Sequence, residues 1–264
     1  MNLELRVVCL RQIENYTIKS LELKIKTLIM IYNNVRNMRV KVGMAMVALF
    51  LFLGVETVGA QSVAALCDSL RAATDRMEYA PDSVDLRLRK ASYNLQLEQW
   101  TYALDEYNYI LRRNPNEVSA LFHRAYVNEK LHRDNFARLD YESLLAIVPG
   151  HFEGQLGLAL LNQKIRRFTD ALDMINRLVS QYPDSAVAYA ARAGIEKEQG
   201  MVSLSVFDYE EAVRRDADNR EYRIDYVDAL LQDKKKDEAR RQLDCLVRMG
   251  VPRASLQKFY KRCK

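Results

Sequence analysis

Glycine and proline are scarce in this sequence, at 9 and 5 of its 264 residues. An all-β domain needs a turn about every eight to twelve residues and relies on these two residue types, so their scarcity argues against that class and favours helices. The chain is too apolar for a disordered protein, with 49% hydrophobic residues, and too charged for a membrane protein of many spans, with 28% charged residues. The composition predicts a globular, mainly helical protein.

Histidine and cysteine are also few, with three and four residues. His123, His132 and His151 do not lie at the i, i+4 spacing of a helical zinc site, and no cysteine or glutamate cluster completes a metal set. The sequence contains no phosphate-binding glycine loop and no serine or cysteine nucleophile motif. We therefore expect no catalytic residue, no metal and no cofactor, and we predict that the protein is not an enzyme.

The sequence has no long run of basic residues. Residues 1–60 hold eight Lys or Arg and four Asp or Glu, which leaves 32 basic and 31 acidic residues for 61–264. The densest basic run, Lys234 to Lys236, is flanked by Asp233 and Asp237. Because nucleic-acid binding needs basic side chains gathered along one surface, we expect no nucleic-acid partner.

Residues 42–55 form an uncharged, mostly apolar run of 14 residues. This run is shorter than the roughly 20 residues that span a bilayer, and its length is typical of the core of a signal peptide. The cationic stretch 38–41 precedes it, and the compact Val58 and Ala60 follow at the −3 and −1 positions of a cleavage site before Gln61. This order predicts an exported protein, periplasmic or secreted.

The signal peptide would occupy residues 38–60, which leaves residues 1–37 unexplained. Either translation starts at Met38, so that 1–37 is an upstream mis-start, or 1–37 forms an isolated amphipathic helix. No lipid-attachment cysteine follows the apolar core, because Cys67 lies too far downstream. We expect no stable membrane span after cleavage; the alternative is a protein tethered by an uncleaved 42–55 segment.

A spacing of 34 residues recurs through the rest of the chain. Four of the five prolines follow it: Pro81, Pro115, Pro149 and Pro183. Three further columns share the same spacing, two of small residues and one of large residues. They are Ala91, Ala125, Ala159, Ala193 and Val227; Ala103, Ala137, Ala171, Ser205 and Ala239; and Tyr107, Tyr141, Ile175, Tyr209 and Leu243.

This pattern resembles the tetratricopeptide repeat, a 34-residue pair of antiparallel helices. The resemblance implies an all-α fold, a right-handed α-solenoid in which small residues let two helices approach and proline ends the second helix. Ser83, Ser185 and Asn219 stand where the following helix needs an N-cap. Five repeats would be flanked by an N-terminal capping helix or partial repeat in 61–83 and a C-terminal capping helix in 254–264. The repeats are 84–117, 118–151, 152–185, 186–219 and 220–253.

The seventh and twenty-third positions of the repeats change together. In the first, second and fourth repeats the seventh position is basic and the twenty-third is acidic. In the third repeat both positions are apolar. The pairs are Lys90 with Glu106, Arg124 with Asp140, Leu158 with Met174, Arg192 with Asp208, and Tyr226 with Gln242. We predict that these side chains meet across the two helices of a repeat; the alternative is coincidence in a highly charged chain.

By resemblance to the family, the second, fifth, ninth and twelfth positions of each first helix face a concave groove. Here the fifth and ninth positions supply the apolar side chains Leu88, Phe122, Tyr126, Leu156, Leu160 and Ile224. The resemblance therefore implies a non-catalytic scaffold that binds a helical or extended segment of another protein. Two alternatives stay open: these residues pack between helices, or the protein is an assembly subunit of an envelope complex that uses its convex face or ends.

Cys245 in the last repeat and Cys263 beyond it have two interpretations. In an oxidising compartment a disulfide between them would hold the last helix in place. Otherwise both are ordinary small apolar residues.

Overall fold

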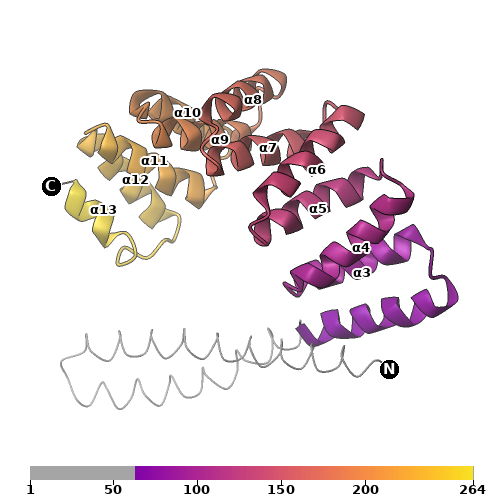
Figure 1. The fold of residues 1–264 in the computed structure, drawn as a ribbon. Coiled ribbons are helices and arrows are strands. Elements are labelled where there is room, and N and C mark those ends of the chain that lie inside the picture. Colours follow the sequence, from indigo (N-terminus) through magenta and orange to yellow (C-terminus); the bar gives the residue numbers. More distant parts are fainter. Residues whose placement is uncertain (1–62, 264) are drawn as a thin grey trace, which may run out of the picture. The chain divides into compact units, whose positions relative to one another are not determined.

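The computed structural model describes residues 63–263, and the chain divides into two compact units, 1–120 and 121–264 (Figure 1). Every described element is helical, as the repeat pattern predicts, and the predicted signal peptide and the residues before it lie outside the described part. A first helix occupies residues 63–79. The others are α3 (Val84–Gln96), α4 (Trp100–Arg113), α5 (Val118–Lys130), α6 (Asp134–Ile147), α7 (Phe152–Lys164), α8 (Phe168–Gln181), α9 (Ala186–Glu198), α10 (Val202–Arg215), α11 (Arg220–Gln232), α12 (Lys236–Arg248) and α13 (Gln257–Arg262).

Each predicted repeat contributes two helices. In the first unit α3 packs against α4. In the second unit α7 packs against α8, α9 against α10 and α11 against α12, and each pair also contacts the helix that precedes it. Successive helix pairs of this kind make an α-solenoid. None of the described helices is both long and apolar enough to span a membrane.

The three columns of the 34-residue spacing lie in the core. All fifteen side chains are at most 4% exposed. In the second repeat, Ala125 on α5 and Ala137 on α6 belong to one apolar cluster with Tyr141. The spacing recurs because the same close approach of two helices is built five times.

Glycine marks two close approaches on α7. A Cβ atom on Gly154 would lie 2.5 Å from Cδ2 of Leu144, the end of a flexible side chain. A Cβ atom on Gly157 of α7 would lie 2.7 Å from Cζ of Tyr141, inside van der Waals contact. On α9, a Cβ atom on Gly194 would lie 3.7 Å from the hydroxyl oxygen of Tyr209, which is an ordinary contact. Of Gly157 and Gly194, only Gly157 is therefore required by packing.

The turn between the two helices of each repeat has one left-handed residue. These residues again lie 34 apart, with φ between 56° and 76°: Glu98, His132, Arg166, Gly200 and Lys234. The N–H that follows bonds back to the first helix, as from Arg167 to the carbonyl of Asn162 at 2.8 Å. This bond closes a Schellman turn and ends the first helix. This column could not be predicted from residue types, because only Gly200 is a residue that favours positive φ.

The predicted N-caps are confirmed. Ser83, Ser185 and Asn219 each accept a hydrogen bond from a backbone N–H of the following helix. In the third repeat His151 has this role, since its Nδ1 accepts from the N–H of Gly154 at 3.1 Å. Histidine is not a typical capping residue, and the sequence pattern missed it.

The second unit ends in α13, which packs against α11 and α12. The hydroxyl of Tyr260 donates to Asp244 at 2.6 Å, and Arg262 forms an ion pair with Asp228 at 2.8 Å. Cys245 and Cys263 are free thiols in this structure, so these polar contacts and apolar packing hold the helix without a disulfide.

Candidate functional site

The fifth-position groove residues of α5, α7 and α11 are half-buried. The ring of Phe122 lies stacked 5.6 Å from that of His151 and edge-on 6.2 Å from that of Tyr141. Leu156 and Ile224 also pack against core clusters. The fifth-position side chains of this unit thus contribute to packing and keep part of their surface in solvent.

Leu160, at the ninth position of α7, is 40% exposed, and Val187 on the neighbouring α9 is 37% exposed. The Tyr126 ring has the Lys130 ammonium 5.0 Å from its centre. Leu88, in the first unit, is half-buried. Binding at these positions stays a prediction.

The bulkiest exposed apolar side chains of the second unit lie on second helices. Phe136 and Leu139 on α6 are 63% and 53% exposed, and Leu204 and Phe207 on α10 are 55% and 57% exposed. Both pairs occupy the nineteenth and twenty-second positions of their repeats. The sequence analysis considered only first helices and missed this surface; comparing the nineteenth positions across repeats would have found it.

The predicted pairing of the seventh and twenty-third positions is confirmed in all three charged repeats. The Lys90 ammonium lies 2.6 Å from Glu106. Arg124 donates two hydrogen bonds to Asp140, and Arg192 donates two to Asp208. The acidic side chains are nearly covered, at 10%, 7% and 2% exposure. These pairs therefore tie the two helices of a repeat together beneath the surface.

The eleventh position adds a third polar group beside each pair. In the second repeat the Asn128 amide donates to Asp140 at 3.0 Å. In the fourth repeat the position holds Glu196, which is 7% exposed. Burial and then the nearby charge of Asp208 raise the pKa of Glu196 to about 7, although Arg192 opposes this. The fourth repeat thus places two carboxyl groups around one guanidinium.

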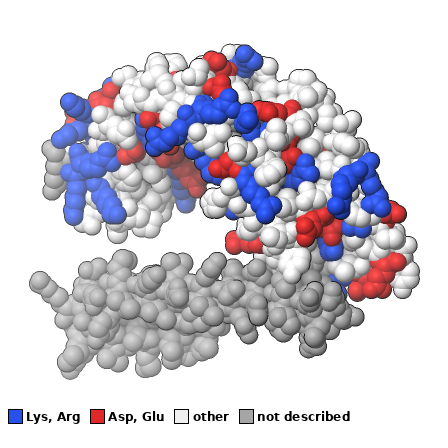
Figure 2. All heavy atoms as spheres, viewed as in Figure 1, with Lys and Arg blue, Asp and Glu red and all other residues white. Residues whose placement is uncertain are grey.

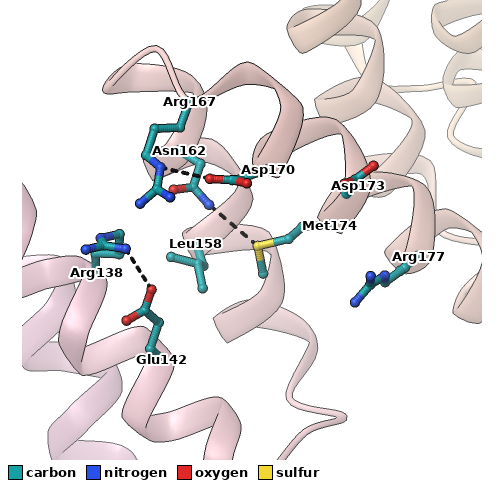
Figure 3. A pocket seen from close by; sticks show the side chains of 9 residues that line it. All are labelled: Arg138, Glu142, Leu158, Asn162, Arg167, Asp170, Asp173, Met174 and Arg177. Atoms are coloured by element: carbon teal, nitrogen blue, oxygen red, sulfur yellow. Dashed lines mark hydrogen bonds and ion pairs between the residues drawn. The ribbon is translucent and has the colours of Figure 1, made fainter.

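The third repeat has no charged pair, and a pocket of about 330 Å³ opens there. Leu158 and Met174 replace the ion pair, and both belong to one apolar cluster. Figure 3 shows the pocket between α6, α7 and α8. Asn162, at the eleventh position, is 4% exposed and donates only to the sulfur of Met174, at 3.6 Å. Its Oδ1 atom has no hydrogen-bond partner.

Paired charges surround this pocket. Arg138 forms an ion pair with Glu142 at 3.1 Å, and Arg167 forms one with Asp170 at 2.8 Å. The remaining lining residues, Asp173 and Arg177, are exposed, and neither makes a hydrogen bond or ion pair within the described residues. The lining thus has three cationic and three anionic side chains.

The structure also shows the surroundings of the histidines. His123 lies edge-on to the Phe122 ring at 5.2 Å, His132 is an exposed turn residue and His151 caps α7. Among residues 63–263, no group of three potential metal ligands comes together.

Basic side chains gather at the end of the second unit formed by α12 and α13 (Figure 2). The residues between 236 and 262 that form this basic end are all exposed: Lys236, Arg240, Arg241, Arg248, Arg253, Lys258, Lys261 and Arg262. Only Lys236 of this set belongs to the basic run 234–236; the others are spread over residues 240–262.

No family model and no curated protein matches the chain. Solved structures do. A tetratricopeptide repeat protein from Parabacteroides merdae is 18% identical, with a TM-score of 0.61 over 97% of this chain and 98% of that one. MamA from Desulfovibrio magneticus is 16% identical, with a TM-score of 0.58 over 64% and 96%. YrrB, a tetratricopeptide repeat protein described as having an unusual peptide-binding site, is 14% identical, with a TM-score of 0.52 over 68% and 93%. The chain folds as a tetratricopeptide-repeat α-solenoid.

Proposed function

We propose that this chain is a non-catalytic scaffold that binds another protein outside the cytoplasm. The observation that carries the proposal is the exposure of apolar side chains in the second unit. The residues of the repeated columns are buried between helices, whereas α6, α7, α9 and α10 each expose other apolar side chains to solvent. Apolar surface that recurs at fixed repeat positions is typical of an interaction surface.

The first candidate surface is the groove predicted from the sequence. In the second unit the first helices α7 and α9 contact each other, and Leu160 on α7 and Val187 on α9 are both exposed. Leu160 and Val187 would be its most accessible apolar contacts, with Phe122, Leu156 and Ile224 offering their uncovered edges. Such a surface suits a helical or extended segment of a partner.

The second candidate is an assembly surface on the second helices. Phe136, Leu139, Leu204 and Phe207 are each more than half exposed, and each is more exposed than any apolar groove residue of the same unit. In the intervening third repeat the same positions hold Asp170 and Asp173, so the α6 pair and the α10 pair are separate apolar patches. Burying either pair against a partner would contribute a few kcal/mol, at about 25 cal/mol per Å². This exposure favours the assembly role that the sequence left as the alternative.

Affinity capture from the exported fraction tests the scaffold and separates the two surfaces. We expect the wild-type chain to retain one protein specifically. Loss on Leu160→Glu but not on Phe136→Glu would assign the groove, and the reverse would assign the second helices. Both residues are exposed, so neither variant should unfold the chain, and circular dichroism provides that control. Retention of no protein above an empty matrix would contradict the proposal.

The proposed export rests on the sequence of residues 38–60. This segment has a cationic stretch, then an apolar core, then small residues before Gln61. If export fails when 42–55 is interrupted by two arginines, the segment is the targeting signal. Unchanged export would contradict it.

A further inference from the structure

The basic end of the second unit differs in charge from the rest of the repeat region. Residues 236–264 contain nine Lys or Arg and three Asp or Glu, and residues 249–264 contain no Asp or Glu at all. Residues 61–235 have the opposite balance, with 23 Lys or Arg and 28 Asp or Glu. The positive charge of the repeat region is therefore concentrated at α12 and α13.

Most cations of the basic end have no carboxylate partner. Of the eight residues that form it, only Arg262 makes an ion pair within the described residues, with Asp228. The guanidinium of Arg253 lies over the ring of Tyr260, 4.7 Å from the ring centre. The other six cations are exposed to solvent. Cations gathered without carboxylates repel one another, and an anionic partner would remove that cost.

The two helices bring their cations together in space. Burial raises the pKa of the Cys263 thiol, and the nearby charges of Arg240, Lys236 and Arg262 oppose this rise. α12 therefore supplies two cations and α13 a third at one place on the surface. Figure 2 shows Lys and Arg side chains gathered at this end of the unit. The basic end is thus a continuous face rather than a set of isolated charges.

This face exposes no large apolar side chain. Between residues 236 and 263, the exposed residues that carry no charge are Gly250, Pro252, Ala254, Ser255 and Gln257. A protein partner is usually held through an apolar or aromatic centre that becomes buried, and the basic end offers none. A bilayer with anionic head groups attracts cations collectively and requires no such centre. The face therefore fits a lipid surface better than a protein.

Nucleic acid is the other polyanion that a basic face could bind. Proteins that hold single strands combine cations with exposed aromatic side chains that stack on the bases. Here Phe259 and Tyr260 are half-buried, and the hydroxyl of Tyr260 already donates to Asp244. The proposed export would also separate the chain from the nucleic acids of the cytoplasm. Both points favour lipid as the partner of this face.

We propose that the basic end binds the head groups of anionic lipids at a membrane surface, through cations that include Lys236, Arg240, Lys258 and Lys261. The inference rests on the proposed export for the place where the chain meets this membrane. Each cation near an anionic bilayer strengthens binding about fivefold. The basic end and α6 lie at opposite ends of the second unit (Figure 1), so a chain held in this way leaves the exposed face of α6 free for a partner protein.

Vesicle flotation tests the proposal on the full chain. Every chain carries two arginines within 42–55, so that this apolar run cannot itself insert into the bilayer. The vesicles contain phosphatidylcholine alone, or two parts of it with one part of the anionic phosphatidylglycerol. We expect binding to the anionic vesicles that weakens at least about tenfold between about 0.05 M and about 0.5 M NaCl, because salt screens exposed charges. Equal binding to both compositions, or binding that salt does not weaken, would overturn the proposal.

Two variants of equal net charge locate the binding. The first combines Lys236→Gln, Arg240→Gln, Lys258→Gln and Lys261→Gln. The second makes the same change at four exposed cations outside the basic end: Arg112, Arg133, Arg166 and Arg177. None of these eight forms an ion pair within the described residues, so both variants should fold, which circular dichroism checks. We expect the first to lose at least about tenfold in affinity for the anionic vesicles and the second less than about threefold. Equal losses would refute the basic end as the binding face.

A short DNA duplex tests the rival polyanion. If the first variant loses affinity for DNA but keeps its affinity for the anionic vesicles, the face serves nucleic acid and the proposal is overturned. The vesicles require neither export nor a partner protein, so the two proposals can fail separately. A chain that captures a partner but does not distinguish the two vesicles refutes the lipid-binding face alone. A chain that binds the anionic vesicles through its basic end but captures no protein refutes the scaffold alone.

Discussion

The buried ion pair of the second repeat should be replaceable by the apolar pair of the third. Arg124 and Asp140 occupy the positions that Leu158 and Met174 occupy one repeat later. We therefore consider three variants: Asp140→Met, Arg124→Leu and the double substitution. The double variant reproduces a pair that this fold already accommodates.

The single variants should be costly. Asp140→Met removes two hydrogen bonds from Arg124, at 3.0 and 2.6 Å, and one from Asn128, at 3.0 Å. Because the Arg124 side chain is 24% exposed, water can partly replace the carboxylate, and we expect a loss of about 2–3 kcal/mol rather than the larger cost of a fully buried pair. Arg124→Leu leaves a carboxylate that is only 7% exposed without its guanidinium, and we expect a similar loss.

The double variant should lose much less than the sum of the two. Replacing both charges by packed apolar groups is often close to neutral. We expect it to lie within about 1 kcal/mol of the wild type, which gives a coupling energy of about 3 kcal/mol or more. Denaturation by urea, followed by far-UV circular dichroism with the m-value checked for each variant, measures this cycle. Additive losses would show that the pairs are not interchangeable and would refute the reasoning.

Four further predictions concern packing, protonation and processing. Gly157→Ala should cost about 1–3 kcal/mol in urea melts, because its methyl group would overlap a buried tyrosine ring, whereas Gly194→Ala should be neutral or stabilise by up to about 1 kcal/mol; the same sign for both would be inconsistent with the packing. The Glu196 carboxyl has its pKa raised to about 7, so its contribution to stability is fully present below about pH 4.5 and is lost as the pH rises through 7; relative to Glu196→Gln, the wild type should lose up to about 3 kcal/mol across that window, and parallel pH profiles would contradict this. Ala125→Leu should destabilise by about 1–3 kcal/mol through overpacking of a fully buried site, and coincident melts would show that the site tolerates the larger side chain. The exported chain should begin at Gln61, which N-terminal sequencing checks; a mature chain that retains residues 1–37 would refute both the signal peptide and the late start.

The repeat architecture could be predicted from the sequence because it depends on side-chain size at fixed spacing. Small residues such as Ala125 and Ala137 are required wherever two helices approach, and a large residue such as Tyr141 fills the remaining space. The charged pairs were also predictable, since Arg124 and Asp140 change together with their counterparts in other repeats. Both signals repeat, and repetition makes a weak local preference visible.

The candidate sites were less predictable because they depend on how completely side chains fill the volume between helices. The pairing of Leu158 with Met174 was predicted correctly. Whether these two side chains fill the volume that an ion pair occupies in other repeats depends on the separation of α6, α7 and α8. The burial of Asn162 without a partner follows from the same geometry. The exposure of Phe136 and Phe207 could not be inferred from the first-helix positions that the family resemblance singles out.

Site-specific photo-crosslinking in cells tests the scaffold function most directly. A photoreactive phenylalanine analogue would replace Leu160, Phe136 or Phe207 in turn, with the exposed polar Gln181 as the control position. We expect at least one of the three to give a discrete adduct with a single other protein, absent at Gln181. Adducts that are absent, or that do not differ from the control at any of the three positions, would contradict the proposal that this solenoid binds a protein partner.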